Sequence, residues 1–373
     1  MTDPRWDQLA DVLVNYSTRV KSGERVLITM LELETFPLVR AVYREVIKAG
    51  GLPFVEFQSA YLERDLMLYG NKEQLEWVPE MQSFGMDWAD VYVGVRGARN
   101  LHEFSGINSE IITAHRRSLG KVSALRNKTR WTLIRVPNES FAQQAGMSLD
   151  DMYNFFFRAT LRDWEAEMEN YREIHASFQA AEQVRIVGNQ TDLSFSTKGR
   201  IYEIAAGKFN MPDGEIFTCP VDDSAQGYIY FEFPGVYAGQ LVEGIRLEFS
   251  QGEIIKSSAD KNADLLHSLL NMDEGARRLG EFGVGTNFGI DRFCFDILYD
   301  EKIGGTIHLA IGRAFEECNG VNQSALHWDI IKDLRQQGEI YLDGKKVFEN
   351  GKFYKLNMSE SIENEISDVS SLD

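Results

Sequence analysis

The first part of the chain alternates apolar runs with an amphipathic segment. Apolar, β-rich runs at 24–30 and 52–57 flank the segment 36–51, whose apolar side chains recur every three or four residues and which ends at two glycines. Strand, helix and strand in this order predict a βαβ unit, which requires a parallel sheet. Further apolar runs at 89–97 and 130–137 predict two more buried strands. The N-terminal part is therefore expected to be an α/β layer.

A change of pattern predicts where the first domain ends. Residues 149–182 carry an aromatic and apolar stripe in steps of three and four, which is typical of a long amphipathic helix packed on a core or a subunit interface. From residue 184, short alternating runs separated by Gly, Asp and Asn predict an α+β fold rich in antiparallel strands. We expect an N-terminal α/β domain with a parallel sheet at 1–183, a C-terminal α+β domain at 184–357 and an acidic, frayed tail at 358–373.

Composition narrows the class of partner. The 373 residues include 57 Asp and Glu against 39 Lys and Arg, a formal net charge of −18. Such a surface repels phosphate, so we expect neither nucleic acid nor an anionic membrane as a partner. The chain has no apolar run of about 18 residues, no basic-then-apolar signal segment and three widely spaced cysteines, which together favour a cytoplasmic protein. None of its glycine-containing loops has the spacing of a nucleotide-binding motif.

Residue types that bind metal ions gather in the second half. His327 and Asp329 are two residues apart, so on an extended segment their side chains share one face and can reach one ion. His308 lies upstream in the apolar, strand-like segment 304–312. Two histidines and one carboxylate are enough for a divalent metal site with open positions.

Two carboxylates upstream open apolar, glycine-flanked segments. Glu215 heads "EIFT" after a Pro-Asp-Gly turn, and Glu281 lies between glycines in "RLGEFGVGTN". Such acids are either buried, where they must be paired or metal-bound, or exposed at a turn, and both readings stay open at this point. The remaining histidines are interpreted as structural or surface residues: His102, His115, His175 and His267.

Four segments carry a resemblance to a known family. In this order, "MPDGEIFTCP", "RLGEFGVGTN", "EKIGGTIHLAIGR" and "NQSALHWD" resemble the signature segments of the aminopeptidase T family of metallopeptidases, the thermophilic metalloprotease type. "VKSGERVLI" and "TDLSFSTKGR" are similar as well, so the resemblance covers residues 8 to 350. It implies an exopeptidase that removes N-terminal residues from peptides using two divalent ions. It also implies an N-terminal α/β domain, a C-terminal metal-binding domain and a homodimer that encloses the active sites.

The resemblance also implies the ligand set. The family's two glutamates, two histidines and aspartate match, one by one, Glu215, Glu281, His308, His327 and Asp329. Five ligands for two ions require sharing, and we expect Glu281 and Asp329 to bridge. Carboxylate-rich sites suit zinc, cobalt or manganese, and the sequence does not choose among them.

One position departs from the family. Seven residues after His308 the family often carries a tyrosine with a proposed catalytic role, whereas this chain has Phe315, which cannot donate a hydrogen bond to an oxyanion. Arg313 is a cationic candidate for that role, and an exposed salt bridge is its other reading.

Three functions are therefore compared. A metallo-aminopeptidase is the leading hypothesis. The second is a non-haem iron ring-cleaving dioxygenase, because two histidines and one carboxylate form the usual ligand set of such iron sites. The third is a non-catalytic metal-binding descendant, because Phe315 replaces the tyrosine.

Overall fold

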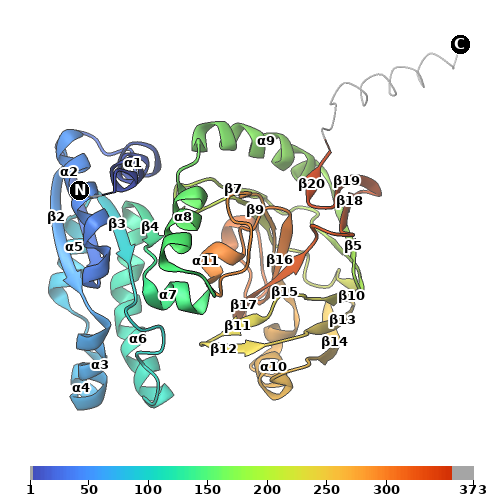
Figure 1. The fold of residues 1–373 in the computed structure, drawn as a ribbon. Helices are drawn as coiled ribbons and strands as arrows, with labels where there is room; N and C mark the ends of the chain where they lie inside the picture. The colour runs from blue at the N-terminus through green and yellow to red at the C-terminus, as the bar shows by residue number, and fades with distance from the viewer. Residues whose placement is uncertain (1–2, 355–373) are drawn as a thin grey trace, which may run out of the picture. The chain divides into compact units, whose positions relative to one another are not determined.

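The computed structural model describes residues 3–354, which form two compact units (Figure 1). The predicted tail at 358–373 lies outside the described residues, and the predicted domain boundary between 183 and 184 stays a prediction. Of the described residues, the first unit comprises 3–169, 204–215 and 285–304, and the second comprises 170–203, 216–284 and 305–354.

The first unit is built on a parallel sheet, as the sequence predicts, and this sheet has a fifth strand, β8, that the sequence analysis did not predict. The strand order is β2-β1-β3-β4-β8, and each neighbouring pair runs parallel. The interiors of β1 (Arg25–Leu31) and β3 (Val91–Arg96) are buried throughout, which explains their continuous apolar runs. The predicted crossover helix is α2 (Phe36–Lys48). The other strands are β2 (Leu52–Gln58), β4 (Arg130–Arg135) and β8 (Asn210–Met211).

Helices make up most of the remaining first unit. A π-helical stretch, Val12–Ser17, continues α1, and short 3₁₀ turns lie at Leu33–Thr35 and Arg126–Lys128. Besides α2, the helices are α1 (Arg5–Asp11), α3 (Ala60–Tyr69), α4 (Lys72–Glu76), α5 (Glu80–Trp88), α6 (Ser109–Leu125), α7 (Glu139–Gln144), α8 (Leu149–Thr160) and α11 (Ile297–Asp300).

The prediction of a single long helix at 149–182 is wrong, because the structure has two helices there. α8 ends where Leu161 leaves the helical region, with φ −87° and ψ 69°. α9 (Trp164–Ala180) begins after Asp163, whose carboxylate accepts a hydrogen bond from the backbone N–H of Ala166 at 3.0 Å. An aspartate in this place stabilises a new helix start. The apolar spacing continues across the short break, so the sequence pattern alone does not reveal it.

The second unit contains two sheets and a hairpin, which agrees with the predicted α+β class rich in antiparallel strands. The larger sheet has the order β14-β13-β10-β6-β5-β18-β19-β20 and is antiparallel throughout. Its strands are β5 (Gln183–Gly188), β6 (Thr191–Ser196), β10 (Gln226–Tyr230), β13 (Arg246–Ser250), β14 (Glu253–Ser258), β18 (Glu339–Leu342), β19 (Lys345–Glu349) and β20 (Lys352–Phe353).

The smaller sheet has five strands in the order β17-β16-β15-β9-β7. Three of its strands, β17 at one edge followed by β16 and β15, pair antiparallel. The remaining elements of this region are the β11–β12 hairpin, the helix α10 and two 3₁₀ turns, Glu274–Arg277 and Glu316–Cys318. The bounds are β7 (Glu203–Ala205), β9 (Glu215–Thr218), β11 (Gly235–Tyr237), β12 (Gln240–Val242), α10 (Ala263–Leu270), β15 (Leu279–Gly285), β16 (Thr306–Gly312) and β17 (His327–Asp333).

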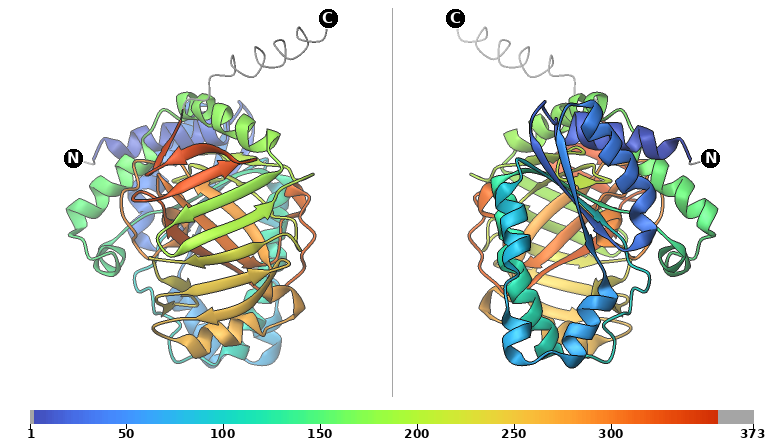
Figure 2. Two further views of the ribbon diagram at one scale, coloured as in Figure 1. Left: turned by 90° about the vertical axis from the view of Figure 1, so that its right-hand side faces the viewer. Right: turned by 90° about the vertical axis from the view of Figure 1, so that its left-hand side faces the viewer.

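The five-stranded sheet of the second unit has one apolar face. Phe282 of β15, Leu309 of β16 and Ile330 of β17 lie in register with one another and are fully buried. The ring of Phe282 packs against Phe195 of β6 with the ring centroids 5.1 Å apart, so this face forms a core with the larger sheet. Figure 2 shows the strands of the smaller sheet behind those of the larger one. Neighbouring residues on each strand point to the opposite face, and the candidate site lies there.

Two expectations from composition concern cysteines and membranes. Cys219, Cys294 and Cys318 are buried free thiols. Among residues 3–354, no helix has the length and apolar character that crossing a bilayer requires.

Candidate metal centre

Four of the five predicted ligands lie on one face of the five-stranded sheet of the second unit, β17-β16-β15-β9-β7. Glu281 of β15 lies opposite Ala310 of β16, which in turn lies opposite Asp329 of β17. His308 precedes Ala310 by two residues, and His327 precedes Asp329 by two. Because residues two apart on a strand share a face, all four ligand side chains point to the same side of the sheet.

Two small residues make room for these side chains. Ala310 occupies the position between Glu281 and Asp329, so no bulky group separates the carboxylates. Gly283 lies opposite His308, and a Cβ at Gly283 would come within 2.1 Å of the imidazole Cε1. Sequence reasoning missed both residues. The available signal was that Gly283 follows Glu281 by two residues, because a glycine inside a strand often marks a close approach.

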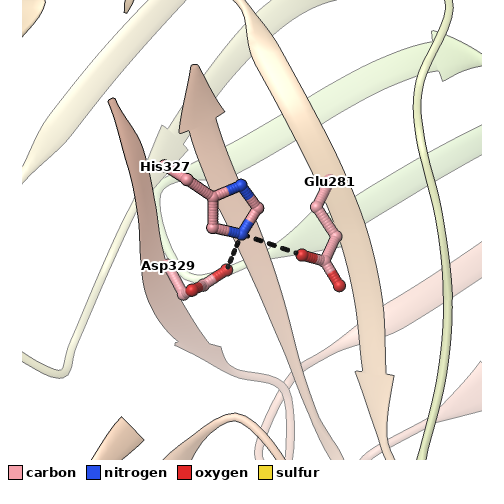
Figure 3. A group of neighbouring side chains, drawn as sticks. All are labelled: Glu281, His327 and Asp329. Carbon is pink, nitrogen blue, oxygen red and sulfur yellow. Dashed lines mark ion pairs between the residues drawn. The ribbon is translucent and has the colours of Figure 1, made fainter. Parts of the chain in front are cut away.

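Glu281 connects the two histidines. Its Oε1 lies 3.4 Å from Nε2 of His308, and its Oε2 lies 3.2 Å from Nε2 of His327. The same His327 nitrogen lies 3.5 Å from Oδ1 of Asp329 (Figure 3). One ligand atom each from Glu281, His327 and Asp329 lies within 4.8 Å of the other two, a spacing at which the three atoms can share an ion. We call these three residues together with His308 the metal-binding group.

Burial within the metal-binding group is graded. The side chains of His308 and Glu281 are 1% and 7% exposed, whereas those of Asp329 and His327 are 15% and 18% exposed. Solvent therefore reaches the group from the His327–Asp329 side. Glu281 is a buried mid-strand residue, so its alternative reading as an exposed turn acid is wrong.

Groups around His327 orient its ring. The Nδ1 atom lies 2.8 Å from the backbone oxygen of Arg313. This oxygen can only accept, so Nδ1 is protonated and its N–H donates a hydrogen bond to the carbonyl. Such an outer contact leaves Nε2 to face the carboxylates, as in many metal-binding histidines. The ring of Phe315 packs against the imidazole with the centroids 4.9 Å apart. The side chain of Arg313 is exposed, and its catalytic role stays a prediction.

Charges in the metal-binding group stabilise one another. Burial by itself would raise the pKa of the Glu281 carboxyl, but hydrogen bonds from His308 and His327 outweigh burial and lower this pKa. Burial would likewise lower the pKa of His327, but Asp329 and Glu281 outweigh it and raise the pKa to about 11. Without a metal ion, His327 is therefore an imidazolium at neutral pH.

We expect metal binding to release a proton from His327. A metal ion binds only the deprotonated Nε2, so each ion bound there at pH 7 displaces about one proton and affinity rises with pH. In the metal-free protein the raised pKa contributes stability below the ordinary value of about 6.5, and this stability is lost as pH rises through about 11. Calorimetric titration of the protein with metal in two buffers of different ionisation enthalpy measures the number of protons released on binding. A His327→Gln variant that still binds metal should release about one proton fewer; equal release would contradict the assignment.

The donor set fits a divalent cation. Two imidazoles and two carboxylates converge, and this mixture of nitrogen and oxygen ligands suits zinc, cobalt and manganese. Oδ1 of Asp329 is buried and makes no hydrogen bond to any residue that the structure describes. A buried carboxylate oxygen needs a compensating positive charge. In the metal-free protein the His327 imidazolium, 3.5 Å away, supplies this charge, and a metal ion would supply it once His327 has lost its proton. Glu281, His308, His327 and Asp329 are therefore the residues that would hold metal.

The fifth predicted ligand, Glu215, has a different environment. It heads β9, which borders β15 in the sheet order, and it is buried. Its Oε1 lies 3.4 Å from Nζ of the fully buried Lys302. Burial would lower the pKa of Lys302, but Glu215 and Glu301 outweigh it and raise this pKa, so Lys302 is charged. Glu215 is not among the three residues of Figure 3, and its role as a ligand stays a prediction.

Lys302 is a third residue that sequence reasoning missed. It lies in "EKIGG", between a glutamate and an apolar, glycine-rich segment. A lysine in such a setting is a candidate for burial, and a buried lysine needs an acidic partner. That rule signals a buried pair without identifying Glu215 as the partner.

Comparison with known proteins places this chain in a class, the metal-dependent peptidases. The chain belongs to the thermophilic metalloprotease (M29) family, whose model matches residues 2–353. Aminopeptidase PepS of Streptococcus thermophilus is 26% identical, with 92% of this chain and 97% of that protein aligned. Aminopeptidase T of Thermus thermophilus is 25% identical, with 91% and 96% aligned. The predicted family is confirmed, as is the prediction of a metallopeptidase.

Solved structures confirm the predicted architecture. Wild-type AmpT from Thermus thermophilus superimposes with a TM-score of 0.82 at 22% identity, covering 94% of this chain and 98% of that one. A 2,5-dihydroxypyridine dioxygenase from Pseudomonas putida KT2440 gives a TM-score of 0.58 at 14% identity, with 94% and 97% covered. At these identities the likeness establishes the fold alone.

Proposed function

We propose that the chain is an aminopeptidase that hydrolyses the first peptide bond of peptides with a free N-terminus, using two divalent ions. The observation that carries this proposal is the convergence of Glu281, His308, His327 and Asp329 on one sheet face in a chain of the M29 family. The relatives named above are aminopeptidases, which supports the choice of exopeptidase. Zinc, cobalt or manganese is the proposed metal.

Five residues are proposed to hold the two ions. Glu281 presents one carboxylate oxygen to each histidine, which suits a ligand shared between two ions. Asp329, the other proposed bridging residue, approaches His327. Glu215 is proposed as the fifth ligand, because it is buried and forms an ion pair with the charged Lys302.

The catalytic logic combines the ions with this chain's own groups. Bound divalent ions would polarise the scissile carbonyl and lower the pKa of a bound water to about 7. The backbone oxygen of Arg313 holds the His327 ring in place. Asp329, the more exposed carboxylate, is proposed to accept a hydrogen bond from the substrate's protonated α-amine. Holding the amine there would restrict cleavage to the first residue.

Blocking the amine tests this restriction. We expect the metal-loaded protein to cleave free aminoacyl-arylamides and to cleave their N-acetylated forms at least about 100-fold more slowly, because a site built to hydrogen-bond a group rejects an analogue without it. The measurement is kcat/KM for matched free and acetylated substrates. Equal cleavage of both would remove the case for an aminopeptidase.

The two alternative functions make different predictions. A ring-cleaving dioxygenase needs one oxygen-sensitive iron per chain and leaves Glu215 and Glu281 without a role. A non-catalytic descendant binds metal but turns over no aminoacyl-arylamide with zinc, cobalt or manganese. Metal stoichiometry and the arylamide assay therefore separate all three functions.

Phe315 gives a test of gained activity. Its ring lies against His327, so a hydroxyl added by Phe315→Tyr would lie next to the metal-binding group. One oxyanion donor is worth roughly 100-fold in kcat, and we expect Phe315→Tyr to raise kcat by up to about that factor. Phe315→Leu, which adds no donor, is the matched control. An unchanged kcat in Phe315→Tyr would show that another group already serves as donor.

Assembly and location are two further proposals. The family resemblance supports a homodimer that encloses the active sites, and the free buried cysteines support a cytoplasmic location. Sedimentation equilibrium of the metal-loaded protein tests the first, with a monomer at micromolar concentration as the contradicting result.

A further inference from the structure

Two phenylalanine rings adjoin the metal-binding group. The ring of Phe315 packs against His327, and the ring of Phe217 packs edge-on against Phe315 with the centroids 5.9 Å apart. Both rings are only partly buried. On β9, the neighbours Ile216 and Thr218 point to the opposite face and are fully buried. Phe217 and Phe315 therefore form a partly open apolar surface beside His327, a proposed metal ligand.

This surface is rigidly supported. Cys219, Ala314 and Cys318 are buried and form the apolar cluster on which the two rings pack. The backbone N–H of Phe315 donates a hydrogen bond to Sγ of Cys219 at 3.2 Å, which fixes the start of the Phe315–Cys318 turn. Polar ligands next to a fixed apolar surface are the usual composition of a small-molecule binding site.

We propose that Phe217 and Phe315 receive the side chain of the substrate's first residue and so select peptides that begin with a large apolar residue. This inference rests on the proposed aminopeptidase function. In an aminopeptidase substrate, the α-amine and the scissile carbonyl are attached to the same Cα. When both groups are held at the metal-binding group, the side chain on that Cα must lie close to the ligands. Phe315, in contact with His327, is in position to meet it.

Negative charge near the Phe217–Phe315 surface argues against substrates whose first residue is acidic. Glu316 and Glu317 directly follow Phe315 and are exposed. The chain as a whole carries a formal net charge of −18. A glutamyl side chain would be repelled there, whereas leucyl or phenylalanyl side chains would cover apolar surface.

The test compares three substrates across four proteins. We expect the metal-loaded wild type to prefer leucyl- over alanyl-arylamide by at least about tenfold in kcat/KM, and to cleave glutamyl-arylamide worst. Phe217→Ala should lower the leucyl-to-alanyl ratio at least about threefold, whereas Phe217→Leu, which stays apolar, should retain it. Phe84→Ala, which removes an exposed phenyl ring from α5, is the matched control and should leave the ratio unchanged. Metal content should be equal in all four.

A binding measurement is independent of turnover. The ratio of the dissociation constants of alanine hydroxamate and leucine hydroxamate should fall in Phe217→Ala by the same factor as the kinetic ratio. If Phe217→Ala slows all substrates equally and leaves the hydroxamate ratio unchanged, Phe217 is merely structural and the inference is wrong. A wild type that cleaves arylamides without an apolar preference overturns this inference alone. A wild type that cleaves none overturns the proposed function and this inference with it.

Discussion

Replacing His327 by alanine is expected to lower kcat/KM for an aminoacyl-arylamide by more than about 100-fold and to weaken metal binding at least as strongly. Nε2 of His327 lies within 3.2 Å of Glu281 and 3.5 Å of Asp329, so it joins both carboxylates of the metal-binding group. Losing an outer partner of a metal ligand already costs about 10- to 100-fold. Losing the ligand itself should therefore cost more.

His267→Ala is the matched control for this substitution. His267 lies on α10 and is exposed, so its loss should change neither metal content nor turnover. Metal content after dialysis and kcat/KM are measured on both variants, together with the melting temperature of the metal-free forms. Full metal content and turnover in His327→Ala would show that the metal-binding group is assigned wrongly.

The second large effect is expected from Gly283→Ala, which changes no ligand. The added methyl group would come within 2.1 Å of Cε1 of His308, so the ring must leave the position in which it meets Glu281. β15 and β16 cannot move apart to make room without losing the hydrogen bonds of their antiparallel pairing. We expect metal affinity to fall at least about tenfold, as for other losses of ligand orientation, and stability to fall by about 1–3 kcal/mol from overpacking.

Gly120→Ala separates this effect from that of an added methyl group as such. Gly120 lies inside α6, where a Cβ meets no heavy atom within 4 Å. Alanine is a better helix former than glycine, so Gly120→Ala should raise stability by about 0.5–1 kcal/mol and leave metal affinity unchanged. Metal titration and chemical denaturation of both variants measure the difference. Unchanged affinity in Gly283→Ala would mean that His308 does not need its observed position.

Local sequence pattern was sufficient to predict which candidate ligands share a face of one strand. The two-residue spacing of His327 and Asp329 puts both side chains on one face whenever the segment is extended, and β17 confirms that it is. The apolar alternation around His308 likewise predicts β16. The parallel sheet could be predicted because a strand, a helix and a strand leave few other topologies.

Features that depend on how strands pair could not be predicted in the same way. Gly283 matters because the β15–β16 register sets it opposite His308, and no local pattern gives a register between strands. The ion pair of Glu215 with Lys302 joins residues that are far apart in sequence.

The break between α8 and α9 was missed because the apolar spacing continues across it while Asp163 starts a new helix.

The most direct test of the proposed function couples metal content to turnover. The protein is stripped of metal with a chelator, titrated with zinc, cobalt or manganese, and assayed with leucyl-arylamide at each step, while bound metal is counted by mass spectrometry. We predict no turnover in the stripped protein and recovery that reaches its plateau at two ions per chain. Full turnover in the stripped protein, or a plateau of binding without any turnover, would contradict the account.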